Sequence, residues 1–552
     1  MNRLIRFILV TVCCAWLSQA APIQAQNASG RLSIPSSMIA SDGTYIAWAV
    51  PSAGGSLIYA RVLQGEVQAR SIGSTSTEVT TLLLSDGIVV WGTRETQNGF
   101  LKQSLNGYNL LNDTPIPVAM LAYQPLLVGS TLFWWDTHPD NPDRQFDGST
   151  ATIMRQSLAP LGAVEAVYQT HFGILFPGQL RAAGGWIAWS EYSGFAYGSV
   201  IWNLFALPPN GSVQLIKENI GCADSRGYDR FALTETSLIY SSSDCYRGPS
   251  NDGKLRILNF ATGQEHVSGP QGNATLFAAG RFVLWNSYGN NNDPSRLWGF
   301  DPSTNSAFQI GTGVTPRAYH NGLLVWSSTT DGTTAVSYAP LTSLLPNAPR
   351  TADDPTLIGR NYYPETGHTL GGSFRTFWNR NGGLAVFGFP LTEEFIQQSP
   401  DATNGYAVQY LERQRYEYHP EHAGTAYEVL LGRLGAEALA RSGRIWQDFP
   451  KADPSTPHYY AQTGQAIAPQ FWEYWRSHGL EFGDRGVSER EALALWGLPI
   501  SPPQQEQTET GEVVLTQWFE RARFEYHPGN PAPYQVLLGR LAVDQVESFG
   551  WK

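Results

Sequence analysis

The chain has 552 residues, of which 42% are apolar and 15% are charged, and its 36 basic and 47 acidic residues give a net charge of −11. The apolar fraction excludes an intrinsically disordered protein, and the length predicts two or more domains. A net-acidic chain without a basic patch disfavours nucleic acid and anionic membrane as partners.

The N-terminus predicts a signal peptide over residues 1–25. Arg3 and Arg6 precede an apolar run from Phe7 to Leu17, which is too short to span a bilayer. Small-residue cleavage sites follow at Ala20 and Ala25. A retained N-terminal anchor is the alternative. We expect a secreted or cell-surface protein with no membrane span after cleavage.

Cleavage would leave Cys222 and Cys245 of the four cysteines. In an oxidising compartment such a pair predicts a disulfide. The rival interpretation, a metal or redox pair, lacks a Cys-x-x-Cys motif and any histidine between the two cysteines.

A short apolar strand with an aromatic end recurs seven times before residue 345. The copies are Tyr45–Trp48, Ile88–Trp91, Thr131–Trp134, Trp186–Trp189, Leu238–Tyr240, Phe282–Trp285 and Leu323–Trp326. Tight-turn signals such as Asp86-Gly87 and Asn321-Gly322 precede several of them, and further strands flank each one. Four strands in about 40–45 residues are typical of a propeller blade. The fold predicted for residues 30–345 is therefore a seven-bladed β-propeller, with a two-sheet sandwich or two smaller β domains as the alternatives.

The seventh unit shows three clear strands. Its fourth is either Arg31–Ile34 at the mature N-terminus, which would close the ring, or Ser343–Ala348. Closure removes the unpaired strand edges that an open array would leave.

Variable loops follow the aromatic strands and would share one face of the propeller, where binding sites tend to lie. Aromatic side chains that could stack on a sugar or peptide make this face the predicted ligand site. The candidates are Tyr192, Phe195, Tyr197, Tyr246 and Tyr288.

The third loop is acidic, with Asp136, Asp140, Asp143 and Asp147. These carboxylates make a candidate Ca²⁺ site, although their spacing does not match the Asp-x-Asp-x-Asp-Gly pattern and a solvated turn is the alternative. We expect no other cofactor.

Several catalytic motifs are absent from the sequence. It contains no Gly-x-Ser-x-Gly, no His-Glu-x-x-His and no Gly-x-x-x-x-Gly-Lys-Ser/Thr. A paired-carboxylate glycosidase stays open, because its two acids need only meet in space.

The C-terminal region is duplicated. Glu412–Pro420 returns as Glu520–Pro528, and Leu430–Leu434 returns as Leu537–Leu541. We therefore predict a smaller α+β region of two repeats, with extra residues around Gly479 to Ala492 in the second. The predicted boundaries are a linker at 346–361, repeat 1 at 362–441, a linker at 442–458 and repeat 2 at 459–546.

Alternation along the duplicated strand places a polar ladder on one side. The ladder residues considered for binding an anionic envelope polymer are Arg413, Arg415, His419, Arg521, Arg523 and His527. A cross-strand salt-bridge network is the alternative. The second copy has Asn530 where the first has His422, which disfavours a metal site.

The Gly-Phe-Pro and Gly-Leu-Pro cores, at Gly388–Pro390 and Gly497–Pro499, each follow a tryptophan in the same repeat. Here the chain resembles a repeat region of secreted bacterial proteins of unassigned function and is distantly similar to LGFP repeats of cell-envelope proteins. The resemblance covers about 190 residues and implies envelope association without catalysis.

Together these features predict a secreted, non-enzymatic binding protein. Its propeller would bind a partner or glycan through the loop-rich face, and its repeats would associate with a cell-envelope polymer, a glycan or a surface protein. The alternatives are a secreted glycan-active hydrolase with its site in the propeller channel, and a structural envelope component.

Overall fold

The structure is a computed structural model. It describes residues 29–551 except 37, 66, 98–99, 119–122, 137–150, 171–177, 197–198, 210, 224–229, 242–254, 269–274, 288–294, 331–332, 353, 355–357, 400–401 and 509–510.

The first part of the chain consists of antiparallel four-stranded arrays that follow one another in sequence. The first array contains β2 (Ile39–Ser41), β3 (Tyr45–Ser52), β4 (Gly55–Val62) and β5 (Arg70–Thr75). The second contains β6 (Val79–Ser85), β7 (Ile88–Gln97), β8 (Phe100–Asn109) and β9 (Thr114–Ile116). The third contains β10 (Tyr123–Val128), β11 (Thr131–Asp136), β12 (Thr152–Ser157) and β13 (Glu165–Gln169).

The next arrays continue the same pattern. The fourth array contains β14 (Arg181–Ala183), β15 (Trp186–Ala196), β16 (Ser199–Leu207) and β17 (Gln214–Ala223). The fifth contains β18 (Phe231–Leu233), β19 (Ser237–Ser241), β20 (Leu255–Asn259) and β21 (Glu265–Ser268). The sixth contains β22 (Leu276–Ala279), β23 (Phe282–Ser287), β24 (Arg296–Asp301) and β25 (Ser306–Thr312).

The last array joins the two ends of this part of the chain. It contains β26 (Thr315–His320), β27 (Leu323–Thr330), β28 (Thr333–Pro340) and β1 (Gly30–Ile34). β1 pairs antiparallel with β28, from Gly30 opposite Tyr338 to Ile34 opposite Thr334. Of the two closing strands that the sequence left open, the structure therefore uses the N-terminal one.

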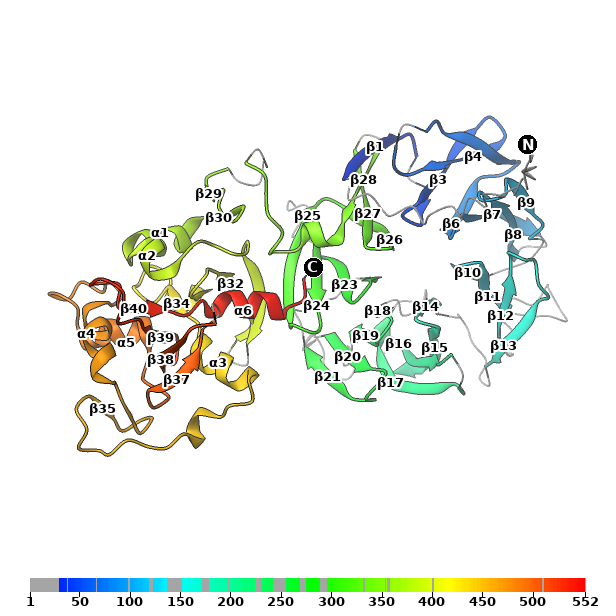
Figure 1. Ribbon diagram of the computed structural model, residues 1–552. Coiled ribbons are helices and arrows are strands. Elements are labelled where there is room, and N and C mark those ends of the chain that lie inside the picture. Colours follow the sequence, from blue (N-terminus) through cyan, green and yellow to red (C-terminus); the bar gives the residue numbers. More distant parts are fainter. Residues whose placement is uncertain are drawn as a thin grey trace, which may run out of the picture.

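The arrays lie around a central axis, with first strands such as β10, β14, β18 and β26 nearest to it (Figure 1). Inner strands of neighbouring arrays contact one another, as β2 and β6 do, and β22 and β26. Apolar clusters fill the spaces between arrays, because each sheet buries side chains on both faces. The fold is thus mainly β and β-propeller-like.

The tight turns that join first and second strands have the conformation that the sequence predicts. Asp86 and Gly87 have φ of 46° and 74°, and Asn321 and Gly322 have φ of 46° and 81°. Asn, Asp and Gly tolerate this left-handed region, and such turns match the twist of the strands that they connect.

The second part contains two copies of one α+β unit. Repeat 1 has β29 (Asn361–Tyr363), β30 (His368–Leu370), α1 (Gly372–Arg380), α2 (Gly383–Phe387), β31 (Phe395–Ser399), β32 (Ala402–Tyr410), β33 (Arg415–Tyr418), β34 (Val429–Leu431) and α3 (Leu434–Arg441). Repeat 2 has β35 (Tyr459–Tyr460), β36 (Gln465–Ala466), α4 (Pro469–Ser477), α5 (Glu489–Trp496), β37 (Gln504–Gln507), β38 (Val513–Trp518), β39 (Arg523–Tyr526), β40 (Val536–Leu538) and α6 (Leu541–Ser548).

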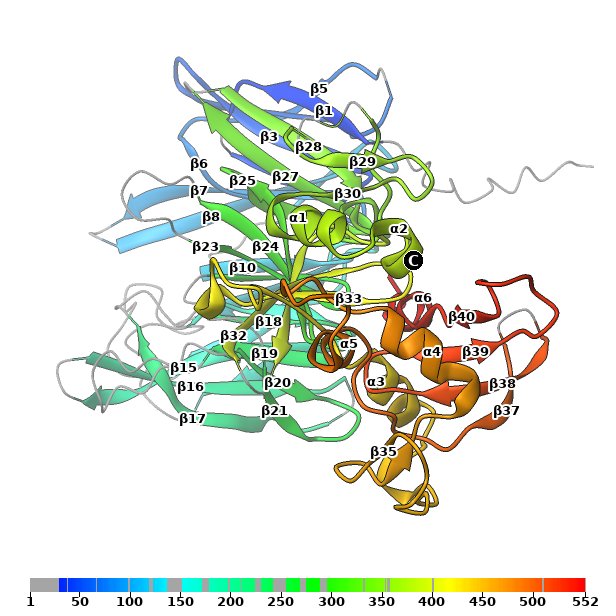
Figure 2. The same cartoon turned by 90° about the vertical axis from the view of Figure 1, so that its left-hand side faces the viewer.

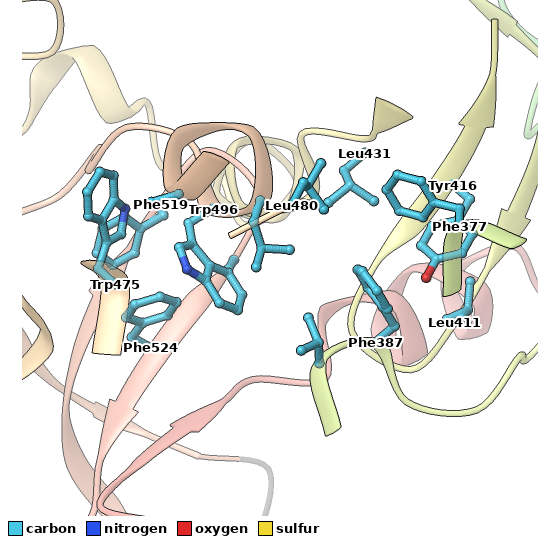
Figure 3. Packing of buried hydrophobic residues seen from close by; sticks show 14 of the residues in the cluster. Phe377, Phe387, Leu411, Tyr416, Leu431, Trp475, Leu480, Trp496, Phe519 and Phe524 are labelled. Atoms are coloured by element: carbon cyan, nitrogen blue, oxygen red, sulfur yellow. The ribbon is translucent and has the colours of Figure 1, made fainter. Parts of the chain in front are cut away.

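The repeats share one apolar core and a reciprocal pair of ionic contacts. Phe377 and Tyr416 of repeat 1 and Trp496 and Phe524 of repeat 2 belong to the same buried cluster, with Leu480 between the two groups (Figure 3). Arg433 binds Glu520 at 2.8 Å, and the equivalent residues Arg540 and Glu412 bind at 3.1 Å. The two copies therefore pack as a pseudo-symmetric pair.

The repeats also join the propeller-like part through a continuous sheet. β25 pairs with β31, so that β22–β25 and β31–β34 form eight strands in one sheet (Figures 1 and 2). The C-terminal Trp551 is buried in the same cluster as Phe308 of β25, and its Nε1 donates to Asp301 Oδ2 at 2.8 Å. Residues 346–361, predicted as a linker, include Ala348, which is buried.

Candidate functional site

A cavity of about 630 Å³ lies at the inner ends of four neighbouring arrays. Inner strands β14, β18, β22 and β26 form most of its wall, so it lies beside the central axis. Its described lining consists of Arg181, Ala182, Ala232, Leu233, Thr275, Leu276, Phe277, Ala278, Asn286, Ser295, Thr315 and Pro316. We call it the channel cavity.

The channel cavity opens on the face that carries the variable loops. Arg181 and Thr315 begin inner strands, and Asn286 and Ser295 flank the connection from β23 to β24. Because the strands alternate in direction, the start of a first strand and the end of a second strand lie at the same edge of an array. The cavity therefore lies at the face where the sequence placed the binding site.

Arg181 is the only charged residue in the described lining. Its guanidinium donates to the Leu180 carbonyl at 3.1 Å and to Gln179 Oε1, and it lies 5.8 Å from the centre of the Phe231 ring. These contacts hold the side chain in one orientation. A guanidinium stays charged and presents five donors, so it suits a carboxylate or phosphate.

Asn286 adds a second polar group. Its Oδ1 is buried and has no hydrogen-bond partner among the described residues. Burying an amide oxygen without a hydrogen-bond partner destabilises the folded protein, and a bound donor such as a hydroxyl would offset that cost. Sequence reasoning missed both residues. The signal for Arg181 was its place three residues before the Gly184-Gly185 turn, which puts it on an inner strand.

A buried acid, Glu191, lies in the middle of β15, the strand that follows β14. Burial raises the pKa of its carboxyl, and a hydrogen bond from Trp189 Nε1 at 2.7 Å opposes that rise. Burial, with a smaller contribution from Glu191, raises the pKa of Tyr168 on the neighbouring array. Glu191 is not part of the described lining of the channel cavity.

The aromatic ligand residues predicted from the sequence lie largely beyond the described part. Tyr192 and Phe195 are in β15, but their side chains are outside the description. Tyr197, Tyr246 and Tyr288 lie outside the described residues altogether. Their role stays a prediction.

The predicted calcium loop and disulfide also lie partly outside the described residues. Asp136 ends β11, whereas Asp140, Asp143 and Asp147 are outside the described residues. Cys222 is in β17, and Cys245 is outside. Within the described ranges no group of three or more His, Cys, Asp or Glu side chains is arranged to hold a metal ion.

The polar ladder of repeat 1 is engaged in internal contacts. Arg415 binds Glu417 at 2.6 Å and Glu437 at 2.8 Å, and its side chain is 12% exposed. His419 Nδ1 lies 2.8 Å from Glu421 Oε1. Arg413 donates to the Leu384 carbonyl at 3.1 Å.

The ladder of repeat 2 repeats this arrangement. Arg523 Nε donates to Glu525 Oε1 at 2.8 Å, and His527 Nδ1 lies 3.3 Å from Glu512 Oε2. Arg521 Nε donates to the Leu431 carbonyl of the other repeat at 3.1 Å, and burial lowers its pKa. This geometry favours the salt-bridge network, which the sequence had left open, over an exposed polymer-binding surface.

Among the described residues, no helix has both the length and the apolar character needed to cross a bilayer.

No family model matches the chain, and no curated protein matches it. Several solved structures match the chain. An oligogalacturonate lyase from Vibrio parahaemolyticus is 13% identical with a TM-score of 0.37, over 56% of this chain and 97% of its own. The β-propeller domain of the trilobed protease from Pyrococcus furiosus is 11% identical with a TM-score of 0.37, over 53% and 91%. A prolyl endopeptidase structure is 10% identical with a TM-score of 0.41, over 72% and 55%.

These structures belong to enzymes, a lyase and peptidases. They contradict the prediction of a non-enzymatic binding protein, and that prediction is wrong. No catalytic residue follows from similarity at this level.

Proposed function

We propose that the protein is a glycan-active enzyme, a hydrolase or a lyase, which binds an anionic glycan in the channel cavity. The observation that supports this is Arg181, the only charged residue in the described lining of a cavity of about 630 Å³. In a chain of net charge −11, a cationic cavity selects an anionic ligand.

The other lining groups suit the remainder of a sugar acid. Thr275, Ser295 and Thr315 bring hydroxyls, and Asn286 brings an amide. Hydroxyls and amides exchange hydrogen bonds with sugar hydroxyls, while Phe277 and Leu276 supply apolar surface. The volume lies in the range of about 300–1,000 Å³ that small-molecule sites occupy.

Arg181 would act on the carboxylate of the substrate. In a lyase reaction a base takes the proton next to the carboxylate, a carbon–carbon double bond forms and the glycosidic oxygen leaves. The negative charge that develops on the carboxylate oxygens would be stabilised by the fixed guanidinium, while the base would come from outside the described lining. The same contact would orient the substrate for hydrolysis. The described lining contains no carboxylate, so paired-carboxylate hydrolysis would require acids from outside it. A serine peptidase is disfavoured because the sequence has no Gly-x-Ser-x-Gly.

The finer predictions made from the sequence complete the proposal. The four-stranded arrays would constitute a seven-bladed propeller that β1 closes, and the chain would be exported, with Cys222 and Cys245 paired. Envelope association through the repeats stays part of this proposal.

The test is a substrate screen with purified full-length protein. Polygalacturonate, alginate and hyaluronan are compared with neutral cellulose and xylan fragments. New reducing ends report either reaction, and ultraviolet absorbance of an unsaturated uronate reports a lyase alone. We expect turnover of at least one acidic glycan and a loss of about a hundredfold or more with Arg181→Ala, because a charge-assisted contact in the transition state is removed.

Arg155→Ala is the matched control. Arg155 on β12 forms an exposed ion pair with Glu165 on β13 and is not part of the described lining, so its loss should leave turnover unchanged. Turnover of neutral glycans only, or equal activity in the two variants, would disprove the proposal.

A further inference from the structure

A second cavity lies between the repeats. A cavity of about 500 Å³ is bounded by α1, by residues 425–429 and by Glu481 and Phe482 of repeat 2. A neighbouring cavity of about 330 Å³ also touches Phe482. We call the two together the inter-repeat groove.

One wall of the groove comes from the segment that repeat 1 lacks. Residues from Gly479 to Ala492 are the insertion that distinguishes the second copy, and Glu481 and Phe482 belong to it. Repeat 1 forms the same α+β unit without these extra residues, although in repeat 2 Leu480 of this segment is buried in the shared core. Glu481 and Phe482 are additions to the common unit that line a cavity, which makes them candidates for a function.

The insertion is held firmly in place. The Phe482 amide donates to Glu491 Oε1 at 2.8 Å, and Ser488 and Glu491 form a capping box at the start of α5. The Glu481 amide donates to Asn381 Oδ1 of repeat 1 at 2.8 Å. The wall is therefore ordered before any ligand arrives, which lowers the entropy cost of binding.

Aromatic rings and polar groups meet in the groove. Tyr427 is 41% exposed, and its ring centre lies 5.2 Å from that of Phe482. Tyr427 lines the smaller cavity, Arg380 and Glu481 are exposed at the larger one, and Phe482 lines both. An aromatic ring packs against the C–H face of a sugar, while charged side chains exchange hydrogen bonds with its hydroxyls.

Glu428 gives the groove a fixed acceptor. Its carboxylate accepts from Ser373 Oγ at 2.6 Å and from the Gly424 amide at 2.9 Å, and these bonds, with that from Ser373 the larger, lower its pKa. A carboxylate that stays ionised can accept further hydroxyl donors, because its two oxygens offer about four lone-pair sites.

From this combination we infer that the inter-repeat groove binds a saccharide. It would be a second site, separate from the channel cavity, and the inference does not rest on the proposed activity. The ligand class follows from the aromatic ring beside an ionised carboxylate and an arginine, since an apolar peptide would leave these charges without partners.

The duplication supplies a matched control. Tyr534 occupies the position in repeat 2 that Tyr427 occupies in repeat 1, and it is 63% exposed. It lines neither cavity of the groove. Removing its ring tests for the general effect of losing a surface tyrosine.

The experiment is isothermal titration calorimetry on the full chain with cellotetraose, chitotetraose and tetragalacturonate as probes. We expect at least one probe to bind, about tenfold weaker binding with Tyr427→Ala, which is about the effect of one aromatic contact, and weaker binding with Arg380→Gln. Tyr534→Ala and Arg181→Ala should bind this site as wild type does. Circular dichroism checks that each variant is folded.

Three results would overturn the inference. They are the absence of binding by all three probes, equal binding by wild type, Tyr427→Ala and Arg380→Gln, and an equal loss in Tyr427→Ala and Tyr534→Ala. A loss of binding in Arg181→Ala alone would also overturn it, because the saccharide would then occupy the channel cavity.

Discussion

At the scale of single residues, burial decides what a charged side chain does. Arg415 and Arg523 lie at equivalent positions and each binds a glutamate two residues along its strand. Side-chain exposures of 12% and 11% leave little of either guanidinium for a polymer. Removing one member of such a pair leaves the other charge buried without a partner.

We therefore expect Arg523→Gln to destabilise the protein by about 3 kcal/mol, because Glu525 would keep its charge without its ion-pair partner. Chemical denaturation followed by tryptophan fluorescence measures this. Arg413→Gln is the control, since the Arg413 guanidinium donates to a carbonyl and is less buried than that of Arg523. Equal, small effects for both variants would show that the network contributes little.

The buried carboxyl of Glu191 predicts that the stability of the folded protein depends on pH. Burial raises the pKa of its carboxyl above the ordinary 4.5, so the folded state binds this proton more tightly than the unfolded state does. The stability linked to Glu191 is fully present below the unfolded pKa and is lost as pH rises through the raised folded pKa.

Glu191→Gln keeps an acceptor for Trp189 and cannot ionise. It should raise Tm relative to wild type at pH values above the folded pKa, with the gain vanishing in acid. Thermal melts across a pH series measure this, and Glu165→Gln, an exposed carboxylate, is the control. A Tm difference that does not change with pH would contradict the assignment.

At the scale of elements, one short strand closes the propeller-like part. β1 gives β28 a complete set of partners, and Ile34 is 3% exposed in the cluster that joins the last and first arrays. Without β1, the edge of β28 would be open to pairing with other chains.

Ile34→Ala should cost about 2–5 kcal/mol, the usual range for a buried isoleucine. Deleting residues 29–34 should go further and cause concentration-dependent association, measured by light scattering. Leu111→Ala, at a residue 68% exposed, should be nearly neutral. A monodisperse, stable deletion variant would show that the ring does not depend on this strand.

At the scale of the whole molecule, the two parts share a core. Phe308, Trp551 and Tyr410 belong to one cluster, which draws on the propeller-like part and on the repeats. The Arg281 guanidinium binds Asp301 at 2.9 Å and donates to the Phe549 carbonyl at 2.7 Å. Since the apolar cluster is buried and shared, we expect the two parts to unfold together, whereas the sequence predicted a linker between them.

Trp551→Ala should cost about 3–5 kcal/mol and uncouple the parts, so that one calorimetric transition becomes two. The Asp301 carboxylate would also lose the indole donor at 2.8 Å. Differential scanning calorimetry measures this, with Trp472→Ala, a half-buried tryptophan of α4 outside this cluster, as the control. Two transitions already present in wild type would show that the domains are independent.

The local elements follow from the sequence alone, because periodicity and turn chemistry specify them. The spacing of the apolar residues Phe374 and Phe377 is that of one helix face and indicates α1, and Asn381 with Gly382, at φ 101°, ends the helix. The recurring aromatic strands and the Asp-Gly and Asn-Gly turns likewise predicted β arrays. Which elements pack against one another is seen only in the tertiary structure. The docking of β31 on β25, the groove between the repeats and the cavity around Arg181 all join residues far apart in the chain, and no local pattern encodes which surfaces come together.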